Sequence, residues 1–255
     1  MQKTWVDELF VGGIYRRLWP TEADILIGSE RSAREVTWAL KLLGDPKPGS
    51  HILDWCGGYG RHALELARRG YEVTLLDYTA SHLDEARQYA QEHDLGLRLI
   101  QADFRQTPAE IQADYAVNLF SSGLGYLGTV EDHEALRSLH CALKDGADIL
   151  IELMNWYRLI RRFAHKSWLR SEDGSLILLE ERELDFARGE IKNHYLIIEN
   201  GQNRRVEGRH VIYTPDRLAG LLLSCGFEVT SIFGDLDGSP FDLGSPRLVV
   251  HAQRF

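Results

Sequence analysis

The chain of 255 residues carries 29 lysines and arginines against 38 acidic residues, a formal net charge of −9 at pH 7. Proteins that bind nucleic acid present clustered positive charge to phosphate, so this balance argues against a nucleic-acid partner. The three cysteines are scattered, which predicts neither a disulfide framework nor a metal site. No apolar run approaches membrane-spanning length and no secretory signal is visible, so we expect a cytoplasmic protein without a membrane partner.

Residues 1–49 are expected to form an N-terminal helical cap. The segment from Trp5 to Trp19 is rich in aromatic residues and is interrupted by Gly12-Gly13. Further on, Ser32 and Glu35 have the spacing of a capping box, and an apolar stripe follows that ends near Gly44. This second segment is predicted to be a helix that serves as scaffold.

The chain is organised around the stretch from Ile52 to Ala63, ILDWCGGYGRHA. It predicts a strand that ends at Asp54, a glycine turn, and a helix that stops at Gly70. Glycines are needed in such a turn because a Cβ would keep the backbone away from a ligand, while the helix N-terminus offers unpaired N–H groups. The next apolar run ends in Asp77, where a ribose diol would lie. The order of these features predicts a nucleotide-cofactor pocket.

Two cofactor classes share this arrangement. The run from Gly58 to Ala63 satisfies the dinucleotide fingerprint G-x-G-x-x-A, so an NAD(P)-dependent oxidoreductase is one interpretation. Asp54 before the glycines and Asp103 after the apolar run of residues 95–100 argue against a dinucleotide. A carboxylate would repel a pyrophosphate in a partly desolvated turn. A cationic sulfonium cofactor tolerates such a carboxylate.

The next segments continue the alternation of strands and helices. Ser81 is expected to cap a helix, and residues 95–100 form the third strand. The apolar runs of residues 113–120 and 149–153 predict two further strands, with a leucine-striped helix between them. Five successive units of this kind predict a mostly parallel, doubly wound sheet.

The pattern changes between Trp168 and Tyr213, where strand-like runs follow one another without helices. An Asn-Gly pair at residues 200–201 lies between two of these runs and is a strong hairpin signal. The three runs are residues 176–186, 191–199 and 205–213. We therefore predict an antiparallel β insertion over residues 165–213, which forms a lid over an acceptor site, a dimer surface, or an edge extension without substrate contact.

The C-terminal part is predicted to complete the main domain. Thr214 and Pro215 start a helix, and residues 227–233 and 248–255 supply two strands without a helix between them, so these strands should pair antiparallel. The expected fold is α/β, with a doubly wound, mostly parallel seven-stranded sheet, an antiparallel C-terminal hairpin strand and the β insertion. The main domain is expected to comprise residues 50–164 and 214–255.

These residues resemble one family. The stretch from Asp54 to Asp77, with residues 101–104 and 118–122, is similar to the class I S-adenosylmethionine-dependent methyltransferases. Within them it resembles the small-molecule branch, which includes amino-sugar N-methyltransferases. The segments 237–241 and 245–248 look like the same group, and a C-terminal hairpin is the usual ending of that fold. Cys56 stands where the family pattern has its first glycine; we expect the turn to be retained, with an altered path at Cys56 as the alternative.

The resemblance implies S-adenosylmethionine as the cofactor and assigns residues to it. Tyr15 and Trp19 would cover the cofactor, with packing on the sheet edge as the alternative. Asp103 would accept from the adenine amino group beside Phe104, with capping of the following turn as the alternative. The full expected set of cofactor residues is Tyr15, Trp19, Asp54, Gly57, Gly58, Gly60, Asp77, Tyr78, Asp103, Phe104, Leu119 and Ser121.

The expected reaction is transfer of the cofactor's methyl group to an amine or hydroxyl of a small-molecule acceptor. The sulfonium is already a good leaving centre, so the protein mainly supplies alignment, and a base is needed only for a protonated or poorly acidic nucleophile. Position alone offers catalytic candidates without selecting one: Tyr126, Asn155, His210 and Tyr213, followed by His62 and Asp237. A non-catalytic cofactor-binding protein remains a further interpretation beside the oxidoreductase, and a homodimer is left open.

Overall fold

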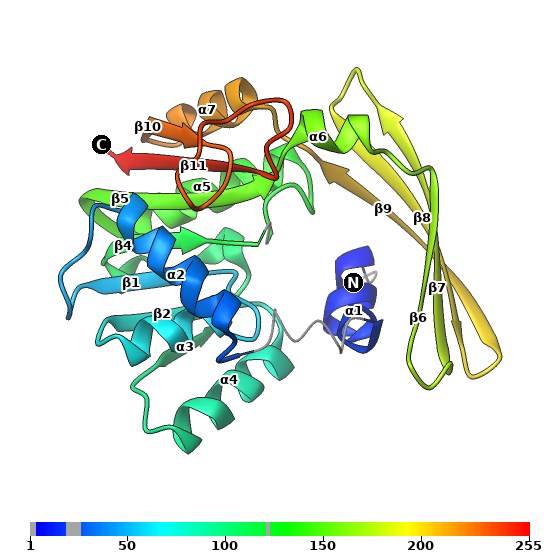
Figure 1. Cartoon of the computed structure of the whole chain (residues 1–255), viewed down its shortest axis with the longest axis horizontal. Coiled ribbons are helices and arrows are strands. Elements are labelled where there is room, and N and C mark those ends of the chain that lie inside the picture. Colours follow the sequence, from blue (N-terminus) through cyan, green and yellow to red (C-terminus); the bar gives the residue numbers. More distant parts are fainter. Residues whose placement is uncertain (1–3, 19–26, 121–122) are drawn as a thin grey trace.

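The computed structural model describes residues 4–18, 27–120 and 123–255. Two sheets dominate these residues. One has seven strands in the order β10-β11-β5-β4-β1-β2-β3, and the other has four in the order β6-β7-β8-β9. Figure 1 shows the smaller sheet curving away from one side of the larger one, with the N-terminal helices in the space between them. No helix among the described residues is long and apolar enough to cross a membrane.

The seven-stranded sheet confirms the predicted α/β fold. Strands β1 to β5 are parallel to one another, whereas β11 pairs antiparallel with both β5 and β10. The strands are β1 (His51–Trp55), β2 (Glu72–Asp77), β3 (Arg98–Gln101), β4 (Ala113–Asn118), β5 (Leu143–Met154), β10 (Phe227–Phe233) and β11 (Arg247–Arg254). Because parallel strands end at the same edge, the turns after β1, β2, β3 and β4 lie next to one another.

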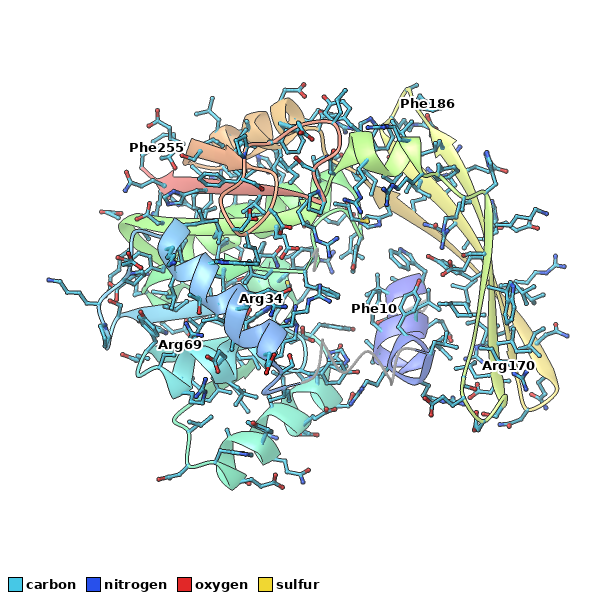
Figure 2. All side chains as sticks on the ribbon, viewed as in Figure 1. Phe10, Arg34, Arg69, Arg170, Phe186 and Phe255 are labelled. Atoms are coloured by element: carbon cyan, nitrogen blue, oxygen red, sulfur yellow. The ribbon has the colours of Figure 1, made fainter. Side chains whose placement is uncertain are left out.

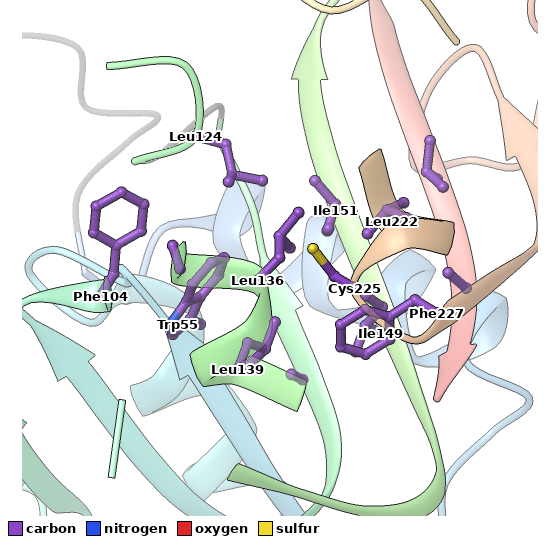
Figure 3. Packing of buried hydrophobic residues seen from close by; sticks show 14 of the residues in the cluster. Trp55, Phe104, Leu124, Leu136, Leu139, Ile149, Ile151, Leu222, Cys225 and Phe227 are labelled. Carbon is purple, nitrogen blue, oxygen red and sulfur yellow. The ribbon is translucent and has the colours of Figure 1, made fainter. Parts of the chain in front are cut away.

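Helices cover both faces of this sheet. The elements are α2 (Glu30–Leu42), α3 (Arg61–Arg68), α4 (Ala80–Glu92), η3 (Phe104–Gln106), η4 (Ala109–Ile111), α5 (Thr129–Ala142), α6 (Trp156–Arg161) and α7 (Pro215–Ser224). One buried cluster joins α5 and α7 to the sheet, and a second joins α2, α3 and α4 to it. Figure 3 shows Leu136 and Leu139 of α5 in the first cluster, together with Trp55 and Phe227. Because helices bury both faces of the sheet, the arrangement is doubly wound.

Two predicted helix starts are wrong. Helix α2 begins one turn earlier than the capping-box spacing indicated, because Ser29 is extended and its hydroxyl accepts from the N–H of Ser32. Ser32 and Glu35 instead contact Arg61. Helix α4 begins at Ala80 with Thr79 in the cap position, so Ser81 lies inside the helix.

The four-stranded sheet is antiparallel and comprises β6 (Lys166–Arg170), β7 (Leu176–Asp185), β8 (Glu190–Glu199) and β9 (Gln202–Val211). Asn200 and Gly201 both have positive φ, 50° and 78°, which confirms the predicted two-residue hairpin turn. Strand β6 was not predicted from the sequence, because Lys166–Arg170 alternates exposed and half-buried residues and has no apolar run. The smaller sheet therefore has one more strand than expected, at its edge.

The N-terminal segment packs on this smaller sheet. It forms the short helical turns η1 (Asp7–Val11) and α1 (Ile14–Leu18), separated by Gly12-Gly13. Leu9, Ile14 and Leu18 are buried in a cluster with residues of β7 and β8. Ion pairs from Arg17 to Glu199 and from Arg204 to Glu8 hold the same contact, while Arg16 reaches Glu85 of α4. The segment thus connects the two sheets.

Candidate functional site

The glycine turn follows β1 and leads into α3. Cys56, Gly58 and Gly60 all have positive φ, at 61°, 58° and 74°. A Cβ on Gly57 would lie 2.6 Å from Oδ2 of Asp54 and closer still to Leu75, so only glycine fits there. The turn is therefore retained with Cys56 in a left-handed conformation, which costs a residue with a Cβ about 1–2 kcal/mol.

Asp54 lies beneath this turn. Its carboxylate is only 1% exposed and accepts from the N–H of Ala63 over 3.0 Å, which ties the strand to the first turn of α3. Burial raises its pKa to about 7. Asp54 therefore supports the turn from inside the fold and does not line the adjoining cavity.

Asp77 comes from the end of β2 and meets the same turn. Its Oδ2 accepts from the N–H of Gly58 over 2.9 Å, and its Oδ1 accepts from the N–H of Thr79 over 2.8 Å. A carboxylate has about four acceptor positions, so two remain for a ligand. The side chain is mostly buried but lines the cavity.

The cavity beside the turn has a volume of about 390 Å³ and brings together most of the expected cofactor residues. Those that line it are Tyr15, Gly57, Gly58, Asp77, Tyr78, Asp103, Phe104 and Leu119. Asp54 and Gly60 lie outside the lining, whereas Trp19 and Ser121 fall outside the described residues. Residues from five segments far apart in the chain thus meet at one edge of the sheet.

Asp103 has two roles in the fold. Its Oδ1 accepts from the N–H of Arg105 over 2.9 Å and so caps η3, which is the alternative that the sequence left open. The same carboxylate pairs with the Arg105 guanidinium, whose hydrogen bond lowers the pKa of Asp103. Because Asp103 also lines the cavity, turn capping and ligand contact are compatible.

Arg61 is a cavity residue that the sequence reasoning missed. It is 8% exposed, and its Nη1 donates to Glu35 and to Ser32. Its guanidinium lies over the Phe120 ring, 5.0 Å from the centroid. Its Nη2 is buried and has no hydrogen-bond partner among the described residues. A basic residue directly after the last glycine of the turn was the available signal.

His62 belongs to the same buried cluster. Its Nε2 lies 2.9 Å from Glu35, and burial lowers its pKa to about 4, so the imidazole is neutral at pH 7. The hydrogen bond with His62 and the charge of Arg61 lower the pKa of Glu35 against the effect of its burial. His62 therefore serves the packing of α2 on α3, although it also touches the cavity.

A second cavity, of about 590 Å³, lies between the N-terminal segment, α6 and the four-stranded sheet. Phe10, Tyr15 and Tyr126 line both cavities, so the two are neighbours. Figure 2 shows Phe10 in the space between the two sheets. Trp5 forms another wall and donates from Nε1 to the carbonyl of Tyr126 over 3.1 Å. The first cavity thus adjoins a larger one with aromatic walls.

The glycine turn lies within a segment that matches a known protein family. Residues 52–146 match the family model described as a methyltransferase domain, and this span contains the turn, Asp77 and Asp103. Residues 52–146 are therefore similar to a methyltransferase domain. This match supports a methyltransferase and gives no support to the oxidoreductase interpretation.

Individual relatives agree with this family. The chain is 27% identical over 128 residues to a glycine/sarcosine N-methyltransferase of Aphanothece halophytica, an alignment that spans 49% of this chain and 48% of the relative. The methyltransferase thus spans about half the length of that relative.

Two solved structures share the fold over almost the whole chain. The CcbJ methyltransferase of Streptomyces caelestis has a TM-score of 0.71 at 20% identity and covers 88% of this chain and 89% of its own. The S-adenosylmethionine-bound CalS10, an amino pentose methyltransferase of Micromonospora echinaspora, has a TM-score of 0.61 at 18% identity over 96% and 97%. The likeness therefore includes the region of the β insertion.

The catalytic candidates of the methyltransferase separate by position. Tyr126, Asn155 and His210 line the second cavity, whereas Tyr213 does not. The hydroxyl of Tyr213 donates to Asp132 over 2.5 Å in the protein interior. Asp237 lines neither cavity and accepts from the N–H of Ser239.

The three candidates in the second cavity differ in their contacts. Asn155 caps α6, and its Nδ2 donates to the carbonyls of Asp242 and Ser245, so its polar atoms are occupied. His210 packs edge-on against Tyr126, with centroids 4.9 Å apart, and burial lowers its pKa to about 4. Burial also raises the pKa of Tyr126. At pH 7 His210 is therefore neutral and Tyr126 is protonated.

Proposed function

We propose that this methyltransferase transfers a methyl group to an amine nitrogen of a small molecule held in the second cavity. The observation that carries the proposal is the wall of Phe10, Tyr15 and Tyr126, which the second cavity shares with the cavity at the glycine turn. A donor at the turn and an acceptor in the larger cavity would then meet beside these rings. Such positioning is the main contribution that a methyltransferase needs from its protein.

The cavity at the glycine turn fits S-adenosylmethionine. Gly57 lets the backbone approach a ligand, because a Cβ there has no space, and Gly58 has open space on the side where its Cβ would lie. Asp77 retains acceptor positions for the two ribose hydroxyls. We propose Tyr15, Gly57, Gly58, Asp77, Tyr78, Asp103, Phe104 and Leu119 as the residues that contact the cofactor.

Arg61 is proposed to bind the cofactor's carboxylate. Its Nη2 is a buried donor without a partner among the described residues, which costs free energy unless a ligand accepts from it. The guanidinium is already oriented by Glu35 and the Phe120 ring, so little side-chain entropy is lost on binding. A carboxylate is the acceptor that best matches a guanidinium.

The groups around the second cavity favour nitrogen over oxygen as the acceptor atom. When bound, S-adenosylmethionine supplies a methyl group on a cationic sulfur. A hydroxyl would need a base to remove its proton, but His210, with a pKa of about 4, is too weak for this and Tyr126 stays protonated. A neutral amine brings its own lone pair. The amino pentose and glycine/sarcosine methyltransferases among the relatives agree with this choice.

The proposal is tested with paired acceptors. Purified protein and S-adenosylmethionine are incubated with amino sugars and amino acids, each paired with the analogue in which a hydroxyl replaces the amine, and S-adenosylhomocysteine release is measured. Turnover of at least one amine without its hydroxyl partner supports the proposal. Turnover of the hydroxyl partners instead would overturn the nitrogen assignment, and tight cofactor binding without any turnover would favour the non-catalytic interpretation.

A further inference from the structure

The second cavity combines aromatic walls with a concentration of arginines. Trp5 stacks on Tyr195 with centroids 6.2 Å apart and an interplanar angle of 17°, and Tyr126 lies 5.3 Å from Trp5. Among the described residues that line the cavity are Arg158, Arg162, Arg182 and Arg247, against the single acid Glu180. In a chain with a net charge of −9, this local excess of positive charge is a feature of the cavity itself.

Two of these arginines are already paired. Arg182 contacts Glu180, and Arg247 contacts Glu152 over 2.7 Å. In the part of the chain that the structure describes, Arg158 and Arg162 have no carboxylate partner. Arg158 donates to the carbonyl of Gly244, over 3.4 Å. Among the described residues, no carboxylate therefore neutralises their positive charges.

The backbone that carries Arg158 and Arg162 is firmly placed. Residues four apart on a helical turn lie on the same side, so both side chains can reach one group. Asn155 caps α6 through the N–H of Tyr157, over 2.9 Å, and anchors it to the segment after β10 through the carbonyl of Ser245, also over 2.9 Å. Asn155 thus anchors the start of α6, the helix that carries Arg158 and ends at its C-cap Arg162, and both arginines line the cavity.

We propose that Arg158 and Arg162 form a subsite for a carboxylate or phosphate group of the acceptor. This inference rests on the proposed function, because it assigns the second cavity to the acceptor. The aromatic wall of Trp5 and Tyr126 would take the acceptor's ring or apolar part, while the two guanidiniums bind its anionic group. The acceptor class is then an amine that also carries an anion.

The anion site is tested with simple probes. Calorimetric titrations use inorganic pyrophosphate, benzoate and the neutral benzamide, each with the protein alone and with the protein saturated with S-adenosylhomocysteine. We expect one of the two anions to bind at least tenfold more tightly than benzamide, and the anion that binds distinguishes a phosphate from a carboxylate source. The expected affinity falls as salt is raised.

Variants locate the site. The double variant Arg158→Gln, Arg162→Gln should bind the anion at least tenfold more weakly. Arg161→Gln is the matched control, because Arg161 lies on the same helix, is exposed and does not line the cavity. If the double variant does not fold, as judged by circular dichroism, Arg162→Gln alone serves, since its side chain is exposed.

Three results would have different meanings. Equal affinity for benzamide and the anions, or equal loss in the Arg161 control, would overturn the anion subsite. Absence of anion binding in a protein that binds S-adenosylhomocysteine normally would overturn it as well. Anion binding that depends on Arg158 and Arg162 in a protein that does not bind S-adenosylhomocysteine would support the subsite while overturning the proposed function.

Discussion

The carboxylate of Asp77 accepts a hydrogen bond from the backbone N–H of Gly58 over 2.9 Å. The end of β2 thereby holds the turn that follows β1, and one side chain links two neighbouring strand ends. Its second oxygen accepts from Thr79 at the start of α4. Asp77 therefore combines a structural role in the turn with acceptor capacity that faces the cavity.

Replacement of Asp77 by alanine should weaken binding of S-adenosylhomocysteine at least tenfold, because charge-assisted hydrogen bonds to a ribose contribute about 1.5–3 kcal/mol each. Titration of 5′-methylthioadenosine and its 2′,3′-dideoxy analogue separates the ribose contact from a loosened turn. The native protein should prefer the ribose form, and the variant should bind both alike. A variant that keeps the preference would show that Asp77 does not contact the ribose.

Replacement of Arg61 by methionine should weaken binding of S-adenosylhomocysteine at least tenfold and leave 5′-methylthioadenosine, which lacks the carboxylate, unaffected. The physical reason is the loss of the unpartnered buried Nη2. Arg31→Met is the control, because Arg31 also pairs with Glu35 but does not line the cavity. An equal loss for both ligands would point to general disruption of the turn.

Replacements of Gly57 and Gly58 should have different effects. Gly57→Ala forces a Cβ to within 2.6 Å of Asp54, so we expect a loss of about 1–3 kcal/mol in the free energy of unfolding. In Gly58→Val the Cβ meets no atom closer than 4.0 Å, so the loss of stability comes from the φ of 58° alone, about 1–2 kcal/mol, and the side chain itself should block the cofactor. Urea unfolding and cofactor titration of both variants test this contrast. Normal cofactor binding by Gly58→Val would place the cofactor elsewhere.

His210 should make stability depend on pH in a defined direction. Burial lowers its pKa from 6.5 to about 4, so between these values the unfolded chain binds a proton that the folded chain does not. Its contribution to stability is complete above pH 6.5 and is lost as pH falls towards 4. Between pH 7 and pH 5, the native protein should therefore lose more unfolding free energy than His210→Gln. Equal losses in urea titrations would contradict this.

Replacement of Tyr213 by phenylalanine should lower the free energy of unfolding by about 1–3 kcal/mol, because its hydroxyl donates to the buried Asp132. The N–H of Gly125 continues to donate to Asp132, so the carboxylate keeps a partner. Cofactor affinity and turnover of the acceptor found in the paired panel should stay unchanged. A large loss of turnover at unchanged stability would restore Tyr213 as a catalytic candidate.

Much of the cofactor side was predictable because its signals are local. Positive φ and close backbone approach require glycine, so the turn at residues 57–60 is visible in the sequence. The acids at the ends of two strands follow from the alternation of strands and helices. The hairpin at Asn200-Gly201 follows from the turn chemistry of two positive φ values.

The acceptor side depended on contacts between distant parts of the chain. Tyr213 and Asn155 seemed equivalent to His210 in the sequence, but the fold places Tyr213 against Asp132 and uses Asn155 to cap α6. The orientation of Arg61 depends on Glu35, which lies 26 residues before it in the chain, and on the Phe120 ring, which lies far after it. No local pattern encodes such meetings.

The sequence by itself determined the alternation of strands and helices, the glycine turn and the acids beside it. Backbone conformation and burial depend there on residue types within a few positions of one another. Only the tertiary structure decided that the N-terminal segment lies on the smaller sheet and shares its aromatic side chains with two cavities. It also placed Arg158 and Arg162 among the residues that line the second of these cavities. Side chains from segments more than a hundred residues apart meet there because packing, rather than local propensity, sets their positions.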